Sequence, residues 1–320
     1  MAAGTESVED KIGNNILFAN MTNTAASDHP GDSDNYFLEG NSHREAGRPL
    51  EAIRMYQASL AINPKQPLAY ANLGSTAWDI GQWEMAIWAY QRGAELAPDM
   101  PEMHLGLGTL FAHGGAYGKA MEALRKAIEI DSGCFNAHHN LLTFGNYFPM
   151  PPEQRFADAE RFGAEAKKRA VPFPSRGRDV GIDRERPLRV GLVSADLRRH
   201  PVAYFLLGVL REMQGFDFFA YSNHQRPDSF TDQFKSACFG WRDVLGMPDR
   251  ELADNIQRDR IDILIDLSGH TAGTRLPVFA WKPAPIQISW LGYFASTGLD
   301  EMDFLIADRS LGVEEEQFFT

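Results

Sequence analysis

Three loops of the sequence carry side chains that could do chemistry, and the first of them presents a histidine. His200 lies in the segment SADLRRHP (residues 194–201), directly after the apolar run LRVGLV (188–193). Such a run is typical of a buried strand, so His200 lies past the carboxyl end of that strand. A histidine there can move a proton near neutral pH or donate a hydrogen bond to a sugar or phosphate oxygen. The spacing alone leaves a second interpretation open, in which His200 caps or packs against the following helix.

The other two loops follow apolar runs further along the chain. The run IDILIDL (261–267) breaks at the small and polar residues SGHTAG (268–273), and the run 286–291 stops at a glycine. Open parallel sheets bind ligands outside the carboxyl ends of their strands, so both loops are expected on one rim. The candidate binding residues there are His270, Thr271, Leu291, Gly292 and Tyr293.

A fixed cation lies close to this rim, because Arg275 comes two residues after Gly273. Arg275 can simply pair with Asp266, or it can orient an acceptor backbone or a donor phosphate. The residue types alone leave both roles open.

The elements that must position these loops alternate between strands and helices. Strands are expected at 188–194, 216–221, 241–245, 261–267, 286–291 and 304–307, with helices at 203–213, 229–239, 249–258 and 276–281 between them. This alternation is the pattern of a parallel sheet covered by helices. The second half of the chain is therefore predicted to be an α/β, Rossmann-like, doubly wound lobe over residues 187–320.

The first half of the chain repeats itself every 34 residues. The repeat is carried by Gly40, Gly74 and Gly108, by Ala52, Ala86 and Ala120, and by Tyr56, Tyr90 and Leu124. A period of 34 residues is that of tetratricopeptide repeats, in which paired helices stack into an α superhelix. We expect three repeats over 33–134, with the glycines and alanines where the helices of a unit approach closely and the large residues filling between units.

The remaining segments are assigned by composition. Residues 1–32 are polar and are expected to form a disordered leader. Residues 135–170 are expected to form capping and connecting helices at the end of the repeats. Residues 171–186 contain two prolines and several charges and are expected to be a linker.

Composition excludes several classes of function. A formal charge of −12 argues against nucleic acid or an anionic membrane as a partner. Cys134 and Cys238 are far apart and suggest inert thiols in a reducing cytoplasm. The adjacent pair His138-His139 points about 100° apart on a helix, so we interpret it as surface or packing histidines rather than as a metal site. No metal or resident cofactor is expected, and the protein is predicted to be cytoplasmic.

The loop sequences also carry a resemblance. The string DLSGHTAGTRLPVFAWKPAPIQISWLGY (266–293) resembles the amino-terminal catalytic half of the O-linked N-acetylglucosamine transferase family, whose members place a tetratricopeptide array before the catalytic region. The resemblance extends over about residues 36–320. The family usually continues Gly-Tyr-Pro-Gly-Thr, whereas this chain has Phe294-Ala295 after Tyr293.

The resemblance implies roles for individual residues. His200-Pro201 matches a His-Pro of the family's active site, considered there for base or positioning duty. Asp254 matches the family's other discussed carboxylate, although it can equally be an exposed helix carboxylate, and Gln257 and Arg258 stand where relatives can carry a histidine. The segment 291–293 matches the stretch whose backbone approaches the donor sugar.

The function implied is protein O-glycosylation. We expect an inverting, metal-independent transferase that moves N-acetylglucosamine from UDP-GlcNAc, as co-substrate, to Ser or Thr of protein acceptors along the repeat groove. The lobe would be the first half of a two-lobed GT-B enzyme, with the second lobe absent and this chain inactive alone. The alternative is a non-catalytic tetratricopeptide adaptor with a vestigial lobe.

Overall fold

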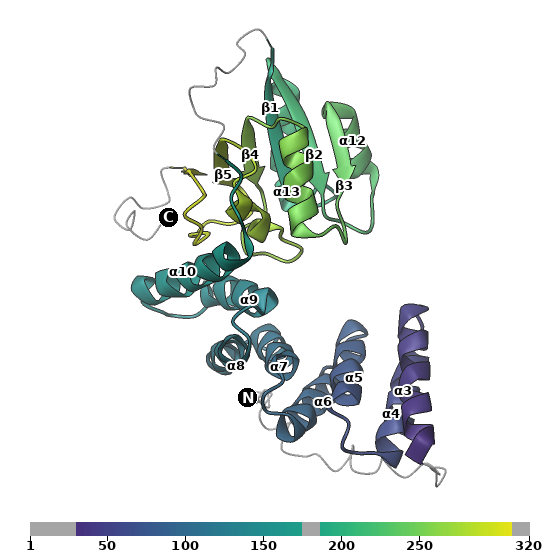
Figure 1. Ribbon diagram of the computed structural model, residues 1–320. Helices are drawn as coiled ribbons and strands as arrows, with labels where there is room; N and C mark the ends of the chain where they lie inside the picture. The colour runs from purple at the N-terminus through teal and green to yellow at the C-terminus, as the bar shows by residue number, and fades with distance from the viewer. Residues whose placement is uncertain (1–29, 175–185, 309–320) are drawn as a thin grey trace, which may run out of the picture. The chain divides into compact units, whose positions relative to one another are not determined.

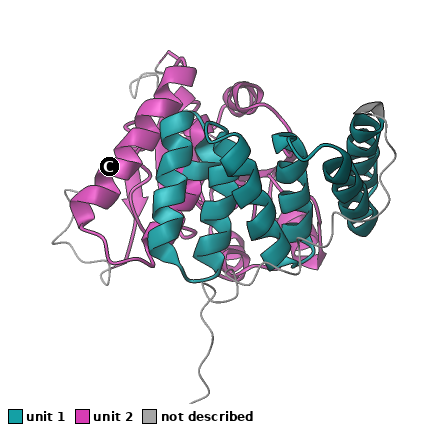
Figure 2. Cartoon of the chain, turned by 90° about the horizontal axis from the view of Figure 1, so that it is seen from below, with its two compact units in different colours: residues 1–137 teal, residues 138–320 magenta. Residues whose placement is uncertain are grey.

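The structure, a computed structural model, describes residues 30–174 and 186–308. It divides into two compact units, residues 1–137 and 138–320 (Figure 2). Most of the expected leader (1–32) and most of the expected linker (171–186) lie outside the described residues. Each unit is therefore described by itself.

The first unit consists of helices joined in pairs by tight turns. The helices are α3 (Pro30–Glu45), α4 (Pro49–Ile62), α5 (Pro67–Asp79), α6 (Trp83–Leu96), α7 (Pro101–His113) and α8 (Tyr117–Ile130) (Figure 1). The turn inside each pair contains a glycine with positive φ, at Gly47, Gly81 and Gly115. Glycine adopts this conformation without the steric cost that a side chain would add. These glycines are also 34 residues apart, so the turn repeats with the helices.

The repeated glycines are required by close packing. A Cβ on Gly40 would lie 2.6 Å from the Tyr56 ring, and one on Gly74 would lie 2.9 Å from the Tyr90 ring. The Tyr56 ring covers the glycine of its own unit, and its side chain also interacts with Asn72 of the next unit, where the large residues are expected to fill. The Tyr90 ring does both, since it also lies against Gly106 of the next unit. Gly106 is therefore a packing residue.

The second unit contains a six-stranded sheet in which every paired neighbour is parallel. Its strands are β1 (Leu188–Ser194), β2 (Phe216–Ser222), β3 (Gly240–Asp243), β4 (Ile263–Asp266), β5 (Ile286–Trp290) and β6 (Phe304–Ile306). Their spatial order is β3-β2-β1-β4-β5-β6. This is the order of a doubly wound, Rossmann-like sheet, so the predicted fold class is confirmed.

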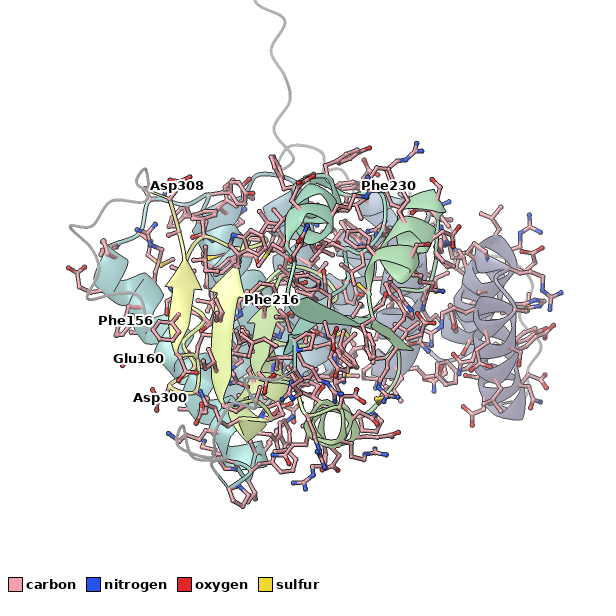
Figure 3. The ribbon with its side chains drawn as sticks, turned by 90° about the horizontal axis from the view of Figure 1, so that it is seen from above. Phe156, Glu160, Phe216, Phe230, Asp300 and Asp308 are labelled. Carbon is pink, nitrogen blue, oxygen red and sulfur yellow. The ribbon has the colours of Figure 1, made fainter. Side chains whose placement is uncertain are left out.

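Four of the described helices cover the two faces of the sheet, and two more precede the sheet in the chain. The helices are α9 (Phe135–Gly145), α10 (Pro152–Arg169), α11 (Pro201–Glu212), α12 (Ser229–Ala237), α13 (Asp249–Arg258) and the 3₁₀ helix η1 (Leu276–Trp281). From β1 the chain adds β2 and then β3 along one half of the sheet, and from β4 it adds β5 and then β6 along the other half. Right-handed crossovers therefore place α11 and α12 on one face of the sheet and α13 and η1 on the opposite face. Accordingly α11 contacts α12, and η1 contacts both α13 and α10. Figure 3 shows Phe156 and Glu160 of α10 near one edge of the sheet and Phe230 of α12 near the other.

Apolar side chains of α11 form the core beneath one face. Leu206 and Leu210 pack with Val190 and Leu192 of β1 and with Phe218 of β2. The strand thus presents alternate residues to this helix, as the period of two predicts. Since α11 begins directly after His200, the same packing fixes the position of that histidine. No helix in the described part of the chain is both long and apolar enough to span a membrane.

Two helix glycines of this unit provide a matched stability test. A Cβ on Gly163 of α10 would lie 1.7 Å from the carbonyl oxygen of Gly298, whereas one on Gly208 of α11 would meet nothing within 4 Å. We expect Gly208→Ala to stabilise the unit by up to about 1 kcal/mol through helix propensity. Gly163→Ala should instead destabilise it by about 1–3 kcal/mol, because a backbone oxygen must move. Urea midpoints of the two variants measure the difference, and equal midpoints would contradict the close contact of α10 with Gly298.

Candidate active site

The carboxyl ends of β1, β4 and β5 form one continuous rim. The three strands are neighbours in the sheet and parallel, so the loops that follow them, 195–200, 267–275 and 291–297, emerge at the same edge. The expectation that His270 and Gly292 share a rim is therefore confirmed. After β1 the chain continues toward one edge of the sheet, and after β4 it continues toward the other edge, so the strand order reverses between β1 and β4. Ligands of such sheets bind at this point of reversal, the switch point.

His200 is the N-cap residue of α11. Its Nδ1 accepts a long hydrogen bond from the backbone N–H of Val202, at 3.4 Å, and lies 3.6 Å from Oδ2 of Asp196. The side chain is 36% exposed. The capping role that the sequence left open is thus present, and it leaves the imidazole accessible at the rim. The structure does not decide between the capping and catalytic interpretations, because one histidine can do both.

The β1 loop is held in place from α12. The backbone N–H of Arg199 donates to Oδ2 of Asp228 at 2.8 Å, and the Thr231 hydroxyl donates to the carbonyl oxygen of Leu197 at 2.9 Å. Asp228 also caps α12. These backbone hydrogen bonds lower the pKa of the Asp228 carboxyl, which therefore stays ionised as a fixed acceptor. The loop that presents His200 is consequently preorganised.

The β4 loop turns around the carboxylate of Asp266. This side chain is 1% exposed and accepts the backbone N–H groups of Ser268 at 3.2 Å and Gly269 at 2.7 Å. Burial raises the pKa of Asp266 to about 6, even though both hydrogen bonds lower it. Thr271, half-buried at the end of this turn, donates its hydroxyl to the carbonyl oxygen of Ser268 at 2.7 Å.

Arg275 does not pair with Asp266, so that alternative is wrong. Its Nε and Nη2 donate to Oδ1 of Asp249 at 2.9 and 2.6 Å. Nη1 and Nη2 also donate to the carbonyl oxygens of Val244 and Met247, at 2.9 and 2.7 Å. The guanidinium is buried and ties the β3–α13 loop to the start of η1. Its role in binding an acceptor or a phosphate stays a prediction, and these internal contacts leave it few donors for such a ligand.

The β5 loop begins with a strained turn. Leu291 has a φ of 74°, and the N–H of Gly292 donates to the carbonyl oxygen of Trp290 at 2.9 Å, which closes a three-residue turn. A side chain in this conformation costs about 1–3 kcal/mol, and such residues cluster at functional sites. A Cβ on Gly292 would lie 1.8 Å from the carbonyl oxygen of Leu267. The glycine is thus required by the protein's own β4 loop; an approach of this backbone to a donor sugar stays a prediction.

His270 is buried and forms a pair with His139 of α9. The two Nδ1 atoms are 2.9 Å apart, and His270 Nε2 lies 3.1 Å from the carbonyl oxygen of Thr297. A carbonyl oxygen only accepts, so His270 carries its proton on Nε2 and His139 donates from Nδ1. Burial lowers the pKa of His139 to about 3 and that of His270 well below its usual range. His270 therefore acts as a neutral internal residue, and a direct contact with a sugar stays a prediction.

Helix α9 holds both rim loops through further hydrogen bonds. The Thr143 hydroxyl donates to the carbonyl oxygen of His270 at 2.8 Å, and the Tyr293 hydroxyl donates to the carbonyl oxygen of Leu142 at 3.3 Å. Burial raises the pKa of Tyr293 to about 12. The interpretation of His138-His139 as packing histidines is confirmed, since both are buried and both rings pack against Phe162. The contact of His139 with His270 was not predicted, because nothing in the sequence links residues so far apart.

Asp254 lies on α13, away from these contacts. Its carboxylate pairs with Arg250 one turn earlier, at 3.2 Å, and its side chain is 41% exposed. This geometry is that of the exposed helix carboxylate that the sequence left open, and a catalytic role stays a prediction. Among the described residues, no group of three His, Cys, Asp or Glu side chains could hold a metal ion.

The structure combines a helical repeat array with a Rossmann-like lobe whose switch-point rim presents a histidine. The profile of Glycosyl transferase family 41 matches residues 138–317, and a tetratricopeptide repeat profile matches 37–101 and 72–133. The chain belongs to glycosyl transferase family 41. The resemblance seen in the sequence is therefore confirmed, and so are the repeats.

Individual relatives agree with this assignment. The chain is 33% identical over 195 residues to a protein of Oryza sativa subsp. japonica named "Probable UDP-N-acetylglucosamine--peptide N-acetylglucosaminyltransferase SPINDLY". This match covers 59% of the present chain and 21% of the relative. It is 32% identical over 154 residues to the protein of Arabidopsis thaliana with the same enzyme name and the designation SEC, covering 47% and 15%. The chain thus spans about a fifth or less of the length of these relatives.

A solved structure is similar over nearly the whole chain. The Thermobaculum terrenum O-GlcNAc transferase mutant K341M superposes with a TM-score of 0.78 at 30% identity, and the match covers 92% of this chain and 57% of that one. Similarity of this extent includes both the repeats and the lobe.

The histidine pair predicts how stability depends on pH. In the unfolded chain both histidines are protonated below about pH 6.5, whereas in the folded protein they stay neutral. Each histidine therefore lowers the free energy of unfolding by about 1.4 kcal/mol for every pH unit below that value. Asp266 acts in the opposite direction between about pH 6 and 4, because its raised pKa lets the fold bind a proton that the unfolded chain does not bind. The three groups together should destabilise the unit by about 1.4 kcal/mol per pH unit in that window.

Urea midpoints at pH 7.5 and 5 measure this dependence. The double variant His139→Leu/His270→Leu should remove both histidine contributions and change the slope by about 2.7 kcal/mol per pH unit. His104→Gln, which alters a histidine of the repeat unit, serves as the control. If the double variant keeps the pH dependence of the parent, the buried neutral pair is contradicted.

Proposed function

We propose that this chain is the repeat-bearing, amino-terminal catalytic part of a protein O-glycosyltransferase that transfers N-acetylglucosamine from UDP-GlcNAc to Ser or Thr of proteins. The observation that carries the proposal is the family 41 match over the unit whose switch-point rim presents His200. The names of the relatives support UDP-GlcNAc as the donor and a peptide as the acceptor.

The proposed reaction is a single displacement with inversion. The acceptor hydroxyl oxygen forms a bond to the anomeric carbon, the bond from that carbon to the diphosphate breaks, and UDP leaves with the electron pair. The hydroxyl proton must go to a base, and His200 is the exposed titratable group that the β1 loop holds at the rim. The UDP-sugar is the co-substrate, and no resident metal is proposed. The segment 291–293 would lie beside the donor sugar, and Thr271 is a half-buried hydroxyl of the neighbouring loop.

The repeats are proposed to bind the acceptor protein. Tetratricopeptide arrays form extended concave surfaces that bind peptides. The three helix pairs α3–α4, α5–α6 and α7–α8 form such an array in this chain. Acceptor choice would then depend on the first unit and the chemistry on the second.

His200 provides the direct test. We expect His200→Asn, in the complete gene product that carries this chain, to lower kcat by at least about 10²-fold, because a proton shuttle typically contributes about 10²–10⁴-fold. Asparagine is a good N-cap residue, so this variant should keep the α11 cap and its melting temperature. His200→Ala should lose activity equally and lose in addition up to about 1 kcal/mol of stability.

The assay follows sugar transfer from labelled UDP-GlcNAc to protein, with Asp232→Asn, an exposed carboxylate on α12, as the control. Full activity of His200→Asn would make the histidine only a helix cap. A parent protein that neither transfers the sugar nor hydrolyses the donor would instead support the non-catalytic adaptor.

A further inference from the structure

The carboxylate of Asp196 faces the ring of His200 from within the same loop. Its Oδ2 lies 3.6 Å from Nδ1, and its side chain is largely buried, whereas the imidazole is accessible. The backbone of Asp196 is fixed at both ends, since its N–H donates to the Ser194 hydroxyl at 2.9 Å and its carbonyl oxygen accepts the N–H of Arg198 at 2.7 Å. The carboxylate therefore faces the histidine from a defined position.

Two groups compete for Nδ1 of His200. The N–H of Val202 requires an unprotonated Nδ1, which would put the proton on Nε2. The Asp196 carboxylate only accepts when ionised, so it requires a proton on Nδ1. The first arrangement makes Nε2 a donor, and the second makes it a proton acceptor. The choice between them decides which chemistry His200 can do at the rim.

Burial raises the pKa of the Asp196 carboxyl, and the neighbouring His200, Arg198 and His224 offset only part of that rise. The Val202 contact, at 3.4 Å, and the Asp196 contact, at 3.6 Å, are both long for a hydrogen bond, but only a contact between an ionised carboxylate and a protonated ring nitrogen is charge-assisted. Asp228, the nearby carboxylate on the α12 side, is occupied by the N–H groups of Arg199, Phe230 and Thr231.

We propose that Asp196 is the positioning residue that keeps the His200 proton on Nδ1 and so leaves Nε2 as the proton acceptor at the rim. The inference rests on the proposed function, because it assigns a partner to the histidine of that reaction. Asp196 does not touch the substrate in this account. It acts through the tautomer and orientation of the imidazole.

The tautomer can be measured without any transferase activity. Long-range ¹H–¹⁵N spectra of the histidine-labelled chain, at about pH 9, where histidine is neutral, distinguish Nδ1–H from Nε2–H. We expect Nδ1–H for His200 in the parent and Nε2–H in Asp196→Ala, where the Val202 N–H is left as the partner of Nδ1. Asp196→Asn, which keeps the side-chain shape, should shift the population in the same direction. Asp232→Asn, an exposed carboxylate on α12, is the control and should leave the parent tautomer unchanged.

Kinetics of the complete gene product provide the second readout. Both Asp196 variants should lower kcat by about 10²-fold or more with KM changed less than about threefold, since the histidine is misoriented while binding is kept. An Nε2–H tautomer in the parent overturns the proposal, whatever the activity. A changed tautomer with kcat unchanged also overturns it. If the tautomers follow expectation but no sugar is transferred by the parent protein, the proposed function fails while the Asp196–His200 pairing stands.

Discussion

The backbones of the β4 and β5 loops touch, and the rest of the candidate site depends on this contact. Gly292 lies against the carbonyl oxygen of Leu267, and a Cβ on Gly269 would lie 2.1 Å from Cβ of Tyr293. No side chain can be inserted between the loops, so their relative position is fixed by backbone atoms rather than by flexible groups. The left-handed conformation of Leu291 is the local cost of that approach.

Three buried polar side chains near this contact are hydrogen-bonded, whereas the buried Ser268 hydroxyl of the β4 loop has no partner among the residues that the structure describes. Asp266 accepts two backbone N–H groups, Arg275 donates to a carboxylate and two carbonyl oxygens, and His270 is held between His139 and Thr297. An unpaired buried group would cost about 1–3 kcal/mol, so these networks favour one arrangement of the rim over others. His200, at the neighbouring strand end, stays partly exposed. The rim thus combines a rigid interior with one accessible titratable ring.

The sequence predicted the elements better than the contacts between them. Strand β1 and helix α13 have the predicted bounds, because apolar runs and amphipathic periods are local signals. Helix α11 begins at Pro201, two residues before its predicted start. The N-cap at His200 and the proline after it define this N-terminus more sharply than the apolar period does. Strand β4 is shorter than the run 261–267, whose ends lie in the turns beside it.

The site was predictable only in outline. The carboxyl ends of parallel strands lie at the same edge of a sheet, so His270 could be predicted near Gly292 without knowing which groups either residue contacts. The pairing of Arg275 with Asp249, and that of His270 with His139 across 131 residues of chain, follow from packing that no local pattern encodes. Asp196 was visible in the sequence beside His200, but its orientation depends on the turn that Ser194 and Arg198 close.

The central claim is that the rim formed after β1, β4 and β5 binds the sugar donor. Hydrogen–deuterium exchange of the complete gene product with and without UDP-GlcNAc tests it most directly. The account predicts slower exchange in segments 195–203, 268–275 and 291–297 when the donor is present, with no change at the opposite ends of the strands, around 186–189 and 214–217. Protection confined to those opposite ends, or none in the rim segments at saturating donor, would contradict it.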